Sequence, residues 1–150
     1  MGSNQNRQSG FTMIEVLVVV AILGIALVGA SLYFKPMEGR LQAAVVLAEG
    51  QFRQARVLAM ATTSAFRVKA DGSTRIVAES ADSCSATTWA TVPELDVDLP
   101  DDVTLTGTAW SFCFGARGVS NVNATIALQH PRLGTTQIEV LRGGTTRIIQ

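Results

Sequence analysis

Apolar residues follow two different patterns in the first part of the chain. From Phe11 to Phe34 they form an almost unbroken run, which at about 1.5 Å per residue in a helix would cross a bilayer of roughly 30 Å. Beyond Pro36, apolar residues recur at alternating steps of four and three, as in an amphipathic helix: Leu41, Val45, Ala48, Phe52, Ala55 and Ala59. Charged residues are expected on much of the opposite face: Glu38, Arg40, Glu49, Arg53 and Arg56. Together the patterns predict one long helix, roughly Phe11 to Thr62, kinked or weakened near Pro36.

Beyond Thr63 the chain changes to short runs of β-forming residues separated by turn residues. Two runs, Phe66–Lys69 and Arg75–Ala78, flank Asp71-Gly72, which predicts a hairpin. Five further strands are predicted: Val103–Leu105, Ser111–Phe114, Thr125–Leu128, Gln137–Val140 and Arg147–Ile149. The segment from Ser80 to Pro100 is predicted to be irregular, with Trp89 as its hydrophobic anchor. The pattern therefore predicts an α+β domain in which an antiparallel sheet, or two small sheets, lies on the helix.

The composition is that of one small domain attached to the apolar run. Of the 150 residues, about 115 follow the run, which is enough for a single core. The formal net charge is zero, so nothing global indicates a nucleic acid or an acidic partner.

Candidate catalytic residues are scarce. His130 is the only histidine, and it precedes Pro131 in a predicted turn, where a surface position is expected. No phosphate-binding loop and no metal-binding motif is present. The sequence therefore predicts neither an enzyme nor a cofactor.

The apolar run contains one charged residue, Glu15. A carboxylate at the centre of a bilayer costs about 2.5–3.5 kcal/mol on insertion scales, so it normally has a partner. If the chain were cut after Gly10, Phe11 would acquire a positive α-amine four residues before this carboxylate.

The N-terminus resembles the class III signal of type IV pilins and pseudopilins in four residues: Gly10, Phe11, Thr12 and Glu15. In that family a prepilin peptidase cleaves after the glycine and methylates the new N-terminal phenylalanine. The resemblance implies a leader of residues 1–10, a membrane-spanning and filament-core half-helix of residues 11–34, and a periplasmic domain of residues 35–150. Two alternatives are a secretory signal peptide cut near Val28-Gly29-Ala30 and a simple one-span anchor.

The C-terminal half is similar to the GspH/FimT group of minor pilins and pseudopilins. The similarity lies in Phe114–Gly118, an F-x-x-x-G turn, and in Ile138–Ile149, two strands joined by a turn with arginine and glycine. It implies the pilin fold, with a long N-terminal helix packed on an antiparallel β-sheet domain.

The function that this similarity implies is non-catalytic. Such a subunit waits in the bacterial inner membrane and then joins other pilins in a type IV pilus or a type II secretion pseudopilus. There Glu15 would pair with the Phe11 amine of an adjacent subunit, which would set the axial register.

Cys84 and Cys113 are the only cysteines. On an exported domain they are expected to form a disulfide that closes a loop of about 30 residues and contributes about 3 kcal/mol. Two buried free thiols are the alternative.

Two ligand-binding hypotheses concern charged segments. Some FimT-type minor pilins bind DNA during natural transformation through basic residues near the C-terminus, and four arginines could contact phosphates here: Arg117, Arg132, Arg142 and Arg147. The alternative is that they are solvated arginines beside an edge strand. Five carboxylates could bind Ca²⁺, but without EF-hand spacing a solvated acidic turn is favoured and no metal site is predicted: Glu94, Asp96, Asp98, Asp101 and Asp102.

Overall fold

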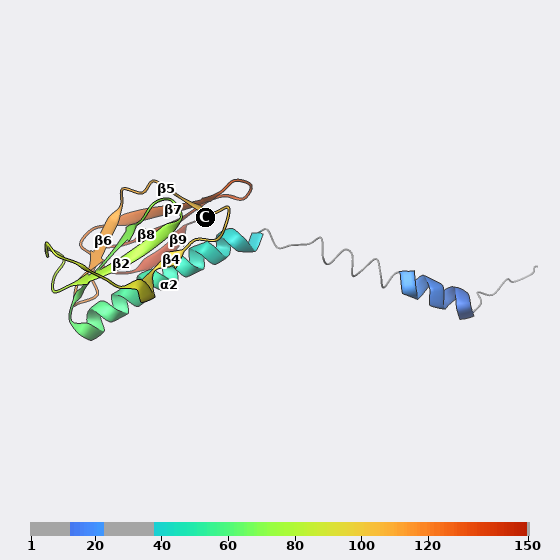
Figure 1. Ribbon diagram of the computed structural model, residues 1–150, viewed down its shortest axis with the longest axis horizontal. Helices are drawn as coiled ribbons and strands as arrows, with labels where there is room; N and C mark the ends of the chain where they lie inside the picture. Colours follow the sequence, from blue (N-terminus) through green and yellow to red (C-terminus); the bar gives the residue numbers. More distant parts are fainter. Residues whose placement is uncertain (1–12, 23–37, 150) are drawn as a thin grey trace, which may run out of the picture. The chain divides into compact units, whose positions relative to one another are not determined.

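The computed structural model describes residues 13–22 and 38–149 (Figure 1). Residues 13–22 are helical and belong to one compact unit, Met1–Pro36, whereas Met37–Gln150 forms a second unit. Within the described residues, no helix is both long and apolar enough to cross a membrane. The predicted leader, the kink at Pro36 and the continuity of the long helix lie outside the described residues.

The second unit begins with helix α2, Glu38–Thr62. All six residues of the predicted amphipathic stripe are buried in the core, so the periodicity is confirmed. The helix ends where predicted because Thr63 adopts a left-handed conformation with φ of 54°. The Ser64 N–H then donates to the Ala59 carbonyl at 3.2 Å, the hydrogen bond of a Schellman motif.

The opposite face of α2 is less charged than predicted, although Arg40 and Arg53 are exposed as expected. Three exposed apolar residues lie on it: Val46, Leu47 and Val57. Met60 is also partly exposed, but its side chain lies against Gly118. Charged side chains such as those of Arg40 and Glu49 lie toward the sides of the helix, because positions follow each other by about 100° around its axis. The exposed face of α2 is therefore mixed, since the charged Arg53, with 67% of its side chain exposed, lies one helical turn from Val57.

The first sheet within the described residues has the order β3-β2-β1-β6, with β4 also paired to β2. Its strands are β1 Ala65–Ala70, β2 Arg75–Ala81, β3 Ala90–Thr91, β4 Val97–Asp98 and β6 Ser111–Phe114. The predicted hairpin at Asp71-Gly72 is confirmed. Gly72 has a positive φ of 72°, and the Asp71 N–H donates to the Arg75 carbonyl at 2.9 Å.

The segment from Ser80 to Pro100 is more ordered than predicted. It contains the end of β2, the short strands β3 and β4, and the 3₁₀ helix η1, Pro93–Leu95. Its hydrophobic anchors are Leu95 and Leu99, which join the core, and not the half-buried Trp89.

The second sheet in the described part of the chain has the order β5-β7-β8-β9. Its strands are β5 Thr104–Thr106, β7 Ala124–His130, β8 Gly134–Val140 and β9 Thr146–Ile149. The predicted surface position of His130 is wrong, since this side chain is only 5% exposed. Strand β7 continues two residues beyond the predicted Leu128, and strand alternation places His130 on the same buried face as Ile126 and Leu128.

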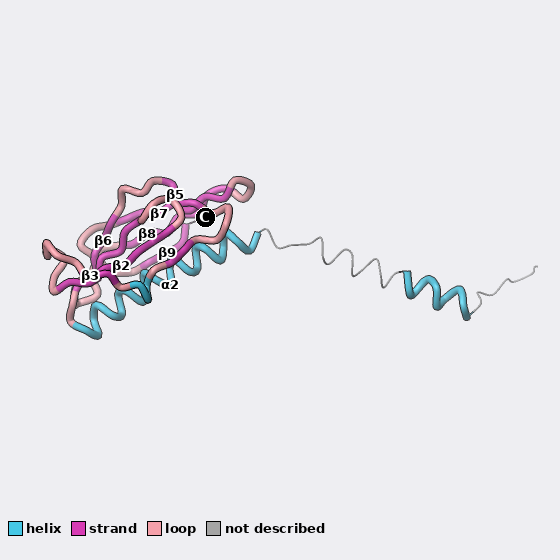
Figure 2. Tube along the Cα trace, in the orientation of Figure 1, coloured by secondary structure: helices cyan, strands magenta, loops and turns pink. Residues whose placement is uncertain are grey.

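Both sheets pack on the core face of α2, so the fold is α+β with antiparallel sheets (Figures 1 and 2). Phe52 of the helix lies at the centre. Its ring meets the ring of Phe112 edge-on at a centroid distance of 5.1 Å, and Phe112 meets Phe114 at 5.4 Å. Edge-on packing of this kind is the favoured arrangement of aromatic rings.

Candidate functional site

The described N-terminal helix carries Glu15 among apolar side chains. Every side chain from residue 13 to residue 22 is exposed, and all except Glu15 are apolar. A helix with this composition is stable in water only if another apolar surface covers it, whether lipid or protein. The processing residues Gly10 and Phe11 lie outside the described residues.

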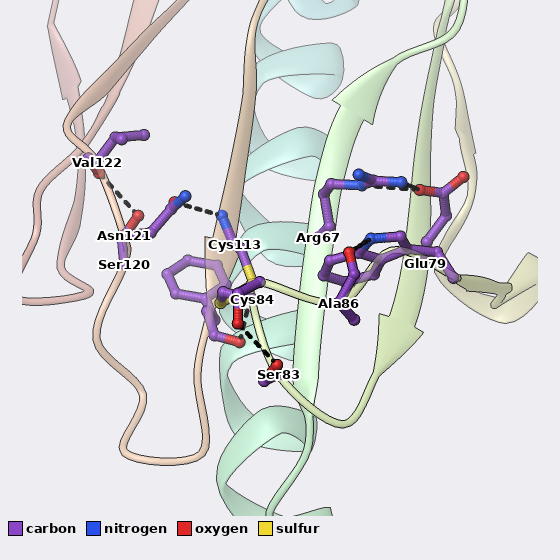
Figure 3. The surroundings of a disulfide bond; sticks show 12 residues. Arg67, Glu79, Ser83, Cys84, Ala86, Cys113, Ser120, Asn121 and Val122 are labelled. Carbon is purple, nitrogen blue, oxygen red and sulfur yellow. Dashed lines mark hydrogen bonds and ion pairs between the residues drawn. A yellow bond between two sulfur atoms is a disulfide. The ribbon is translucent and has the colours of Figure 1, made fainter.

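Cys84 and Cys113, the predicted pair, are joined by a disulfide with a Cα–Cα distance of 5.8 Å (Figure 3). The bond ties the loop after β2 to strand β6. The free edge of β6 at Cys113 is occupied by Asn121, whose Oδ1 accepts the Cys113 N–H at 2.8 Å and whose N–H donates to the Cys113 carbonyl at 3.0 Å. The side chain thus completes a ladder that would otherwise be open to another strand.

We expect the replacement of both cysteines by serine to lower the free energy of unfolding by about 3 kcal/mol. The bridge spans 29 residues, and its loss would enlarge the conformational entropy of the unfolded chain. Urea denaturation would measure the change, and reduction of the wild-type disulfide serves as the matched control. An unchanged midpoint in both cases would contradict the expectation.

A charged cluster on β1 and β2 also contacts the loop after β2, through Trp89. The Arg67 guanidinium lies 4.2 Å from the centroid of the Trp89 ring, a cation–π contact. Arg67 and Lys69 both pair with the Glu79 carboxylate. Burial alone would raise the pKa of Glu79, but the hydrogen bonds and charges of Lys69 and Arg67 outweigh it and hold this pKa below its ordinary value. Glu79 is therefore ionised at neutral pH, and the cluster has a positioning role for the loop.

The two segments that resemble the GspH/FimT group meet on α2. The Ser120 N–H donates to the Arg142 carbonyl at 2.9 Å, and Arg56 Nε donates to the Gly118 carbonyl at 2.9 Å. A Cβ on Gly144 would lie 1.9 Å from the Gly118 oxygen, and Gly144 also has a φ of 80°. Glycine is therefore required there by both space and backbone conformation. Sequence reasoning identified the two segments, but it missed the contact between them and the hydrogen bond from Arg56 to Gly118. No local pattern in the sequence indicates either interaction.

The four arginines proposed for DNA binding are not gathered on one surface. Arg147 pairs with Glu139, whereas Arg117, Arg132 and Arg142 are exposed and have no acidic partner among the described residues. Arg132 follows β7 and Arg142 follows β8, at opposite ends of the seven-residue strand β8, which separates them by roughly 20 Å. The arrangement does not support a DNA-binding surface.

The acidic segment is engaged in ion pairs. Asp96 and Asp98 pair with Arg75 at 2.8 and 3.5 Å, and Asp102 pairs with Arg40 at 3.4 Å. Over residues 13–22 and 38–149, no group of three or more potential ligand side chains could hold a metal ion. Three of the five carboxylates, those of Asp96, Asp98 and Asp102, therefore form ion pairs with arginines of the same domain.

Comparison with known proteins finds similarity at both levels, in sequence motif and in fold. Residues 5–31 match the family model described as the prokaryotic N-terminal methylation motif. No curated protein matches the sequence. Among solved structures, the type IV minor pilin FimU of Pseudomonas aeruginosa PAO1 is similar, with a TM-score of 0.60 at 15% identity over 75% of this chain and 90% of FimU. The minor pseudopilin EpsH of the type 2 secretion system of Vibrio cholerae is also similar, with a TM-score of 0.52 at 12% identity over 71% of this chain and 95% of EpsH.

The chain has the pilin fold. The motif match includes Gly10, Phe11 and Glu15, the residues on which the sequence resemblance was based. Motif and fold together confirm the resemblance to type IV minor pilins and pseudopilins. In this pilin fold the buried aromatic core, the disulfide and the two meeting segments all belong to the second unit.

Proposed function

We propose that this chain is a non-catalytic minor pilin or pseudopilin subunit of a type IV pilus or a type II secretion pseudopilus. One observation carries the proposal: a methylation motif at residues 5–31 precedes a domain with the pilin fold. The motif explains why a charged residue stands near the start of an apolar run, and the fold supplies the domain that such a run would anchor.

The mechanism is assembly. A prepilin peptidase removes residues 1–10 and methylates Phe11, and the apolar half-helix holds the subunit in the inner membrane with its domain in the periplasm. During assembly this half-helix moves from lipid into the apolar core of a filament. The Phe11 amine of one subunit then neutralises Glu15 of a neighbour, which favours one axial register because any other leaves a carboxylate without its countercharge.

The domain has the features of a part that works outside the cytoplasm. A disulfide between Cys84 and Cys113 forms and persists in an oxidising compartment such as the bacterial periplasm. Its buried aromatic residues hold the sheets on the helix, which suits a subunit whose role is structural.

Intact-mass spectrometry of the chain purified from its native host tests the proposal. The expected mass is that of a chain that begins at Phe11 and carries one added methyl group, and a Gly10→Val variant is expected to keep its full length. A wild-type chain that retains Met1, or one that begins near Ser31 after cleavage by a general signal peptidase, would overturn the proposal.

A further inference from the structure

The edges of the first sheet are closed by hydrogen bonds from other parts of the chain. At β6, Asn121 occupies the N–H and the carbonyl of Cys113. On the other side of the sheet, where β3 and β4 leave a gap along β2, Asp96 Oδ1 accepts the Ala78 N–H at 3.2 Å. The Val92 N–H donates to the Ala78 carbonyl at 3.0 Å. Both edges thus offer few free main-chain groups to a further strand.

The two edges of the second sheet differ from each other. At β5, the Leu105 N–H donates to the Ser73 carbonyl at 2.7 Å, so the turn between β1 and β2 covers this edge. At the other edge, β9 pairs with β8 on one side only. Strand β9 is therefore the edge at which a further strand could be added.

The direction of the main-chain groups of β9 follows from the turn that precedes it. The Leu141 N–H donates to the Thr145 carbonyl at 2.9 Å, and hydrogen-bonded pairs recur at every second position of an antiparallel ladder. Arg147 therefore exchanges its main-chain hydrogen bonds with β8, whereas the N–H and C=O groups of Thr146 and Ile148 point away from β8. Within residues 38–149, no hydrogen bond occupies these outward groups.

Strand β9 also lacks the features that usually protect an edge strand, which are free charges, proline and a β-bulge. Its pairing with β8 is continuous from Thr146 to Ile149. Its one charged residue, Arg147, is paired with Glu139 of β8. Ile149 is 39% exposed. An unprotected edge of this kind is suited to recognition of an extended segment through main-chain hydrogen bonds.

A symmetric pair of copies of this chain does not fit the edge. In a twofold antiparallel pair that uses the outward groups of both Thr146 and Ile148, Arg147 lies directly opposite the same residue of the other copy. Like charges at directly opposed positions destabilise a strand pair. The occupant is therefore a strand of different sequence.

The two faces of β9 indicate which side chains the added strand carries. Ile148 packs against the core, so an apolar residue beside it would extend that core. Arg147 lies on the opposite face with 61% of its side chain exposed, and an acidic residue beside it would form a cross-strand pair of opposite charges.

We propose that β9 binds an extended segment of a different protein, which adds a strand to the second sheet and places an acidic residue beside Arg147 and an apolar residue beside Ile148. An extended segment fits better than a helix because the outward groups of β9 need main-chain partners, and a helix satisfies its own main chain internally. The inference goes beyond the proposed function, since pairing at β9 involves only the domain.

The variant Ile148→Pro separates strand addition from folding. Proline is tolerated on an edge strand where the missing N–H would face outward, but it cannot donate to an added strand. Ile148→Ala is the matched control, because it also loses the isoleucine side chain but keeps the N–H. The full-length chain, with a photo-cross-linker in place of the exposed Ile149, is expressed in the native host with and without each substitution, and its adducts are mapped by mass spectrometry.

The chain without a further substitution is expected to cross-link to a segment of a different protein that has an acidic and an apolar residue at neighbouring positions. Ile148→Pro is expected to give a yield about tenfold or more below that of Ile148→Ala, because main-chain hydrogen bonds supply the affinity for an added strand. Equal yields from the two variants would overturn the inference, as would the absence of any adduct or adducts only to a helix, to lipid or to a second copy of this chain.

Hydrogen exchange tests the same edge without a substitution at Ile148. In the purified full-length chain, the amides of Thr146 and Ile148 are expected to exchange faster than the amide of Arg147, which is bonded to β8. In the purified cross-linked complex all three should be protected, and unchanged exchange of the two outward amides would contradict strand addition. These results are independent of N-terminal processing, whereas a wild-type chain that keeps residues 1–10 contradicts only the proposed function.

Discussion

Replacement of Glu15 by leucine is expected to lower incorporation into the filament at least tenfold while membrane insertion is maintained. The substitution makes the apolar run more favourable in lipid, so the chain still reaches the membrane. It also removes the charge that would attract the Phe11 amine of a neighbouring subunit, and with it the preference for one axial register. Co-purification of the tagged chain with other pilins, normalised to its amount in the membrane fraction, measures the effect.

Two further variants distinguish charge from size at this position. Glu15→Gln keeps the shape of the side chain without its charge and is expected to be nearly as defective as Glu15→Leu, and Glu15→Ala should behave in the same way. Co-purification of all three variants at the wild-type level would show that the carboxylate has no part in assembly.

The substitution Phe52→Ala is expected to have the largest effect on stability, a loss of about 3–5 kcal/mol in the free energy of unfolding. The Phe52 side chain is fully buried. Its ring packs against Phe112 at 5.1 Å and Trp110 at 6.4 Å between centroids, and thereby joins the helix to the first sheet. Truncation leaves a cavity that these rings can fill only in part. Urea denaturation of the unit Met37–Gln150 measures the loss.

Val57→Ala is the control on the same helix. Val57 lies on the exposed face of α2 and is 57% exposed, so its truncation should change the free energy of unfolding by less than about 0.5 kcal/mol. Equal effects of the two substitutions would mean that Phe52 does not lie at the centre of the core.

Local patterns were sufficient to predict helix α2 and all strands of the second unit except the short β3 and β4. The stripe from Leu41 to Ala59 predicted the buried face of α2, because the helical period depends only on backbone geometry. Gly72 and Gly144 marked turns that need a positive φ, a requirement that belongs to the residue and its immediate neighbours. The exposed apolar residues Val46, Leu47 and Val57 were not singled out, because one apolar face is the usual expectation for a helix.

Features that depend on distant residues were predicted less well. The burial of His130 follows from the length of β7, which depends on pairing with β8 along the whole strand. The anchors of the segment before β5 are Leu95 and Leu99, because the backbone path and not side-chain size decides which residue reaches the core.

The sequence by itself determined the helix period, the turns and the methylation motif with Glu15 inside an apolar run, since each depends on residues a few positions apart. Only the tertiary structure decided that the strands divide into two sheets and that Gly118 and Gly144 meet beside Arg56. These contacts join residues far apart in the chain. Such contacts form only when the shapes and polar groups of separate elements fit together, which the spacing of residues along the chain does not encode.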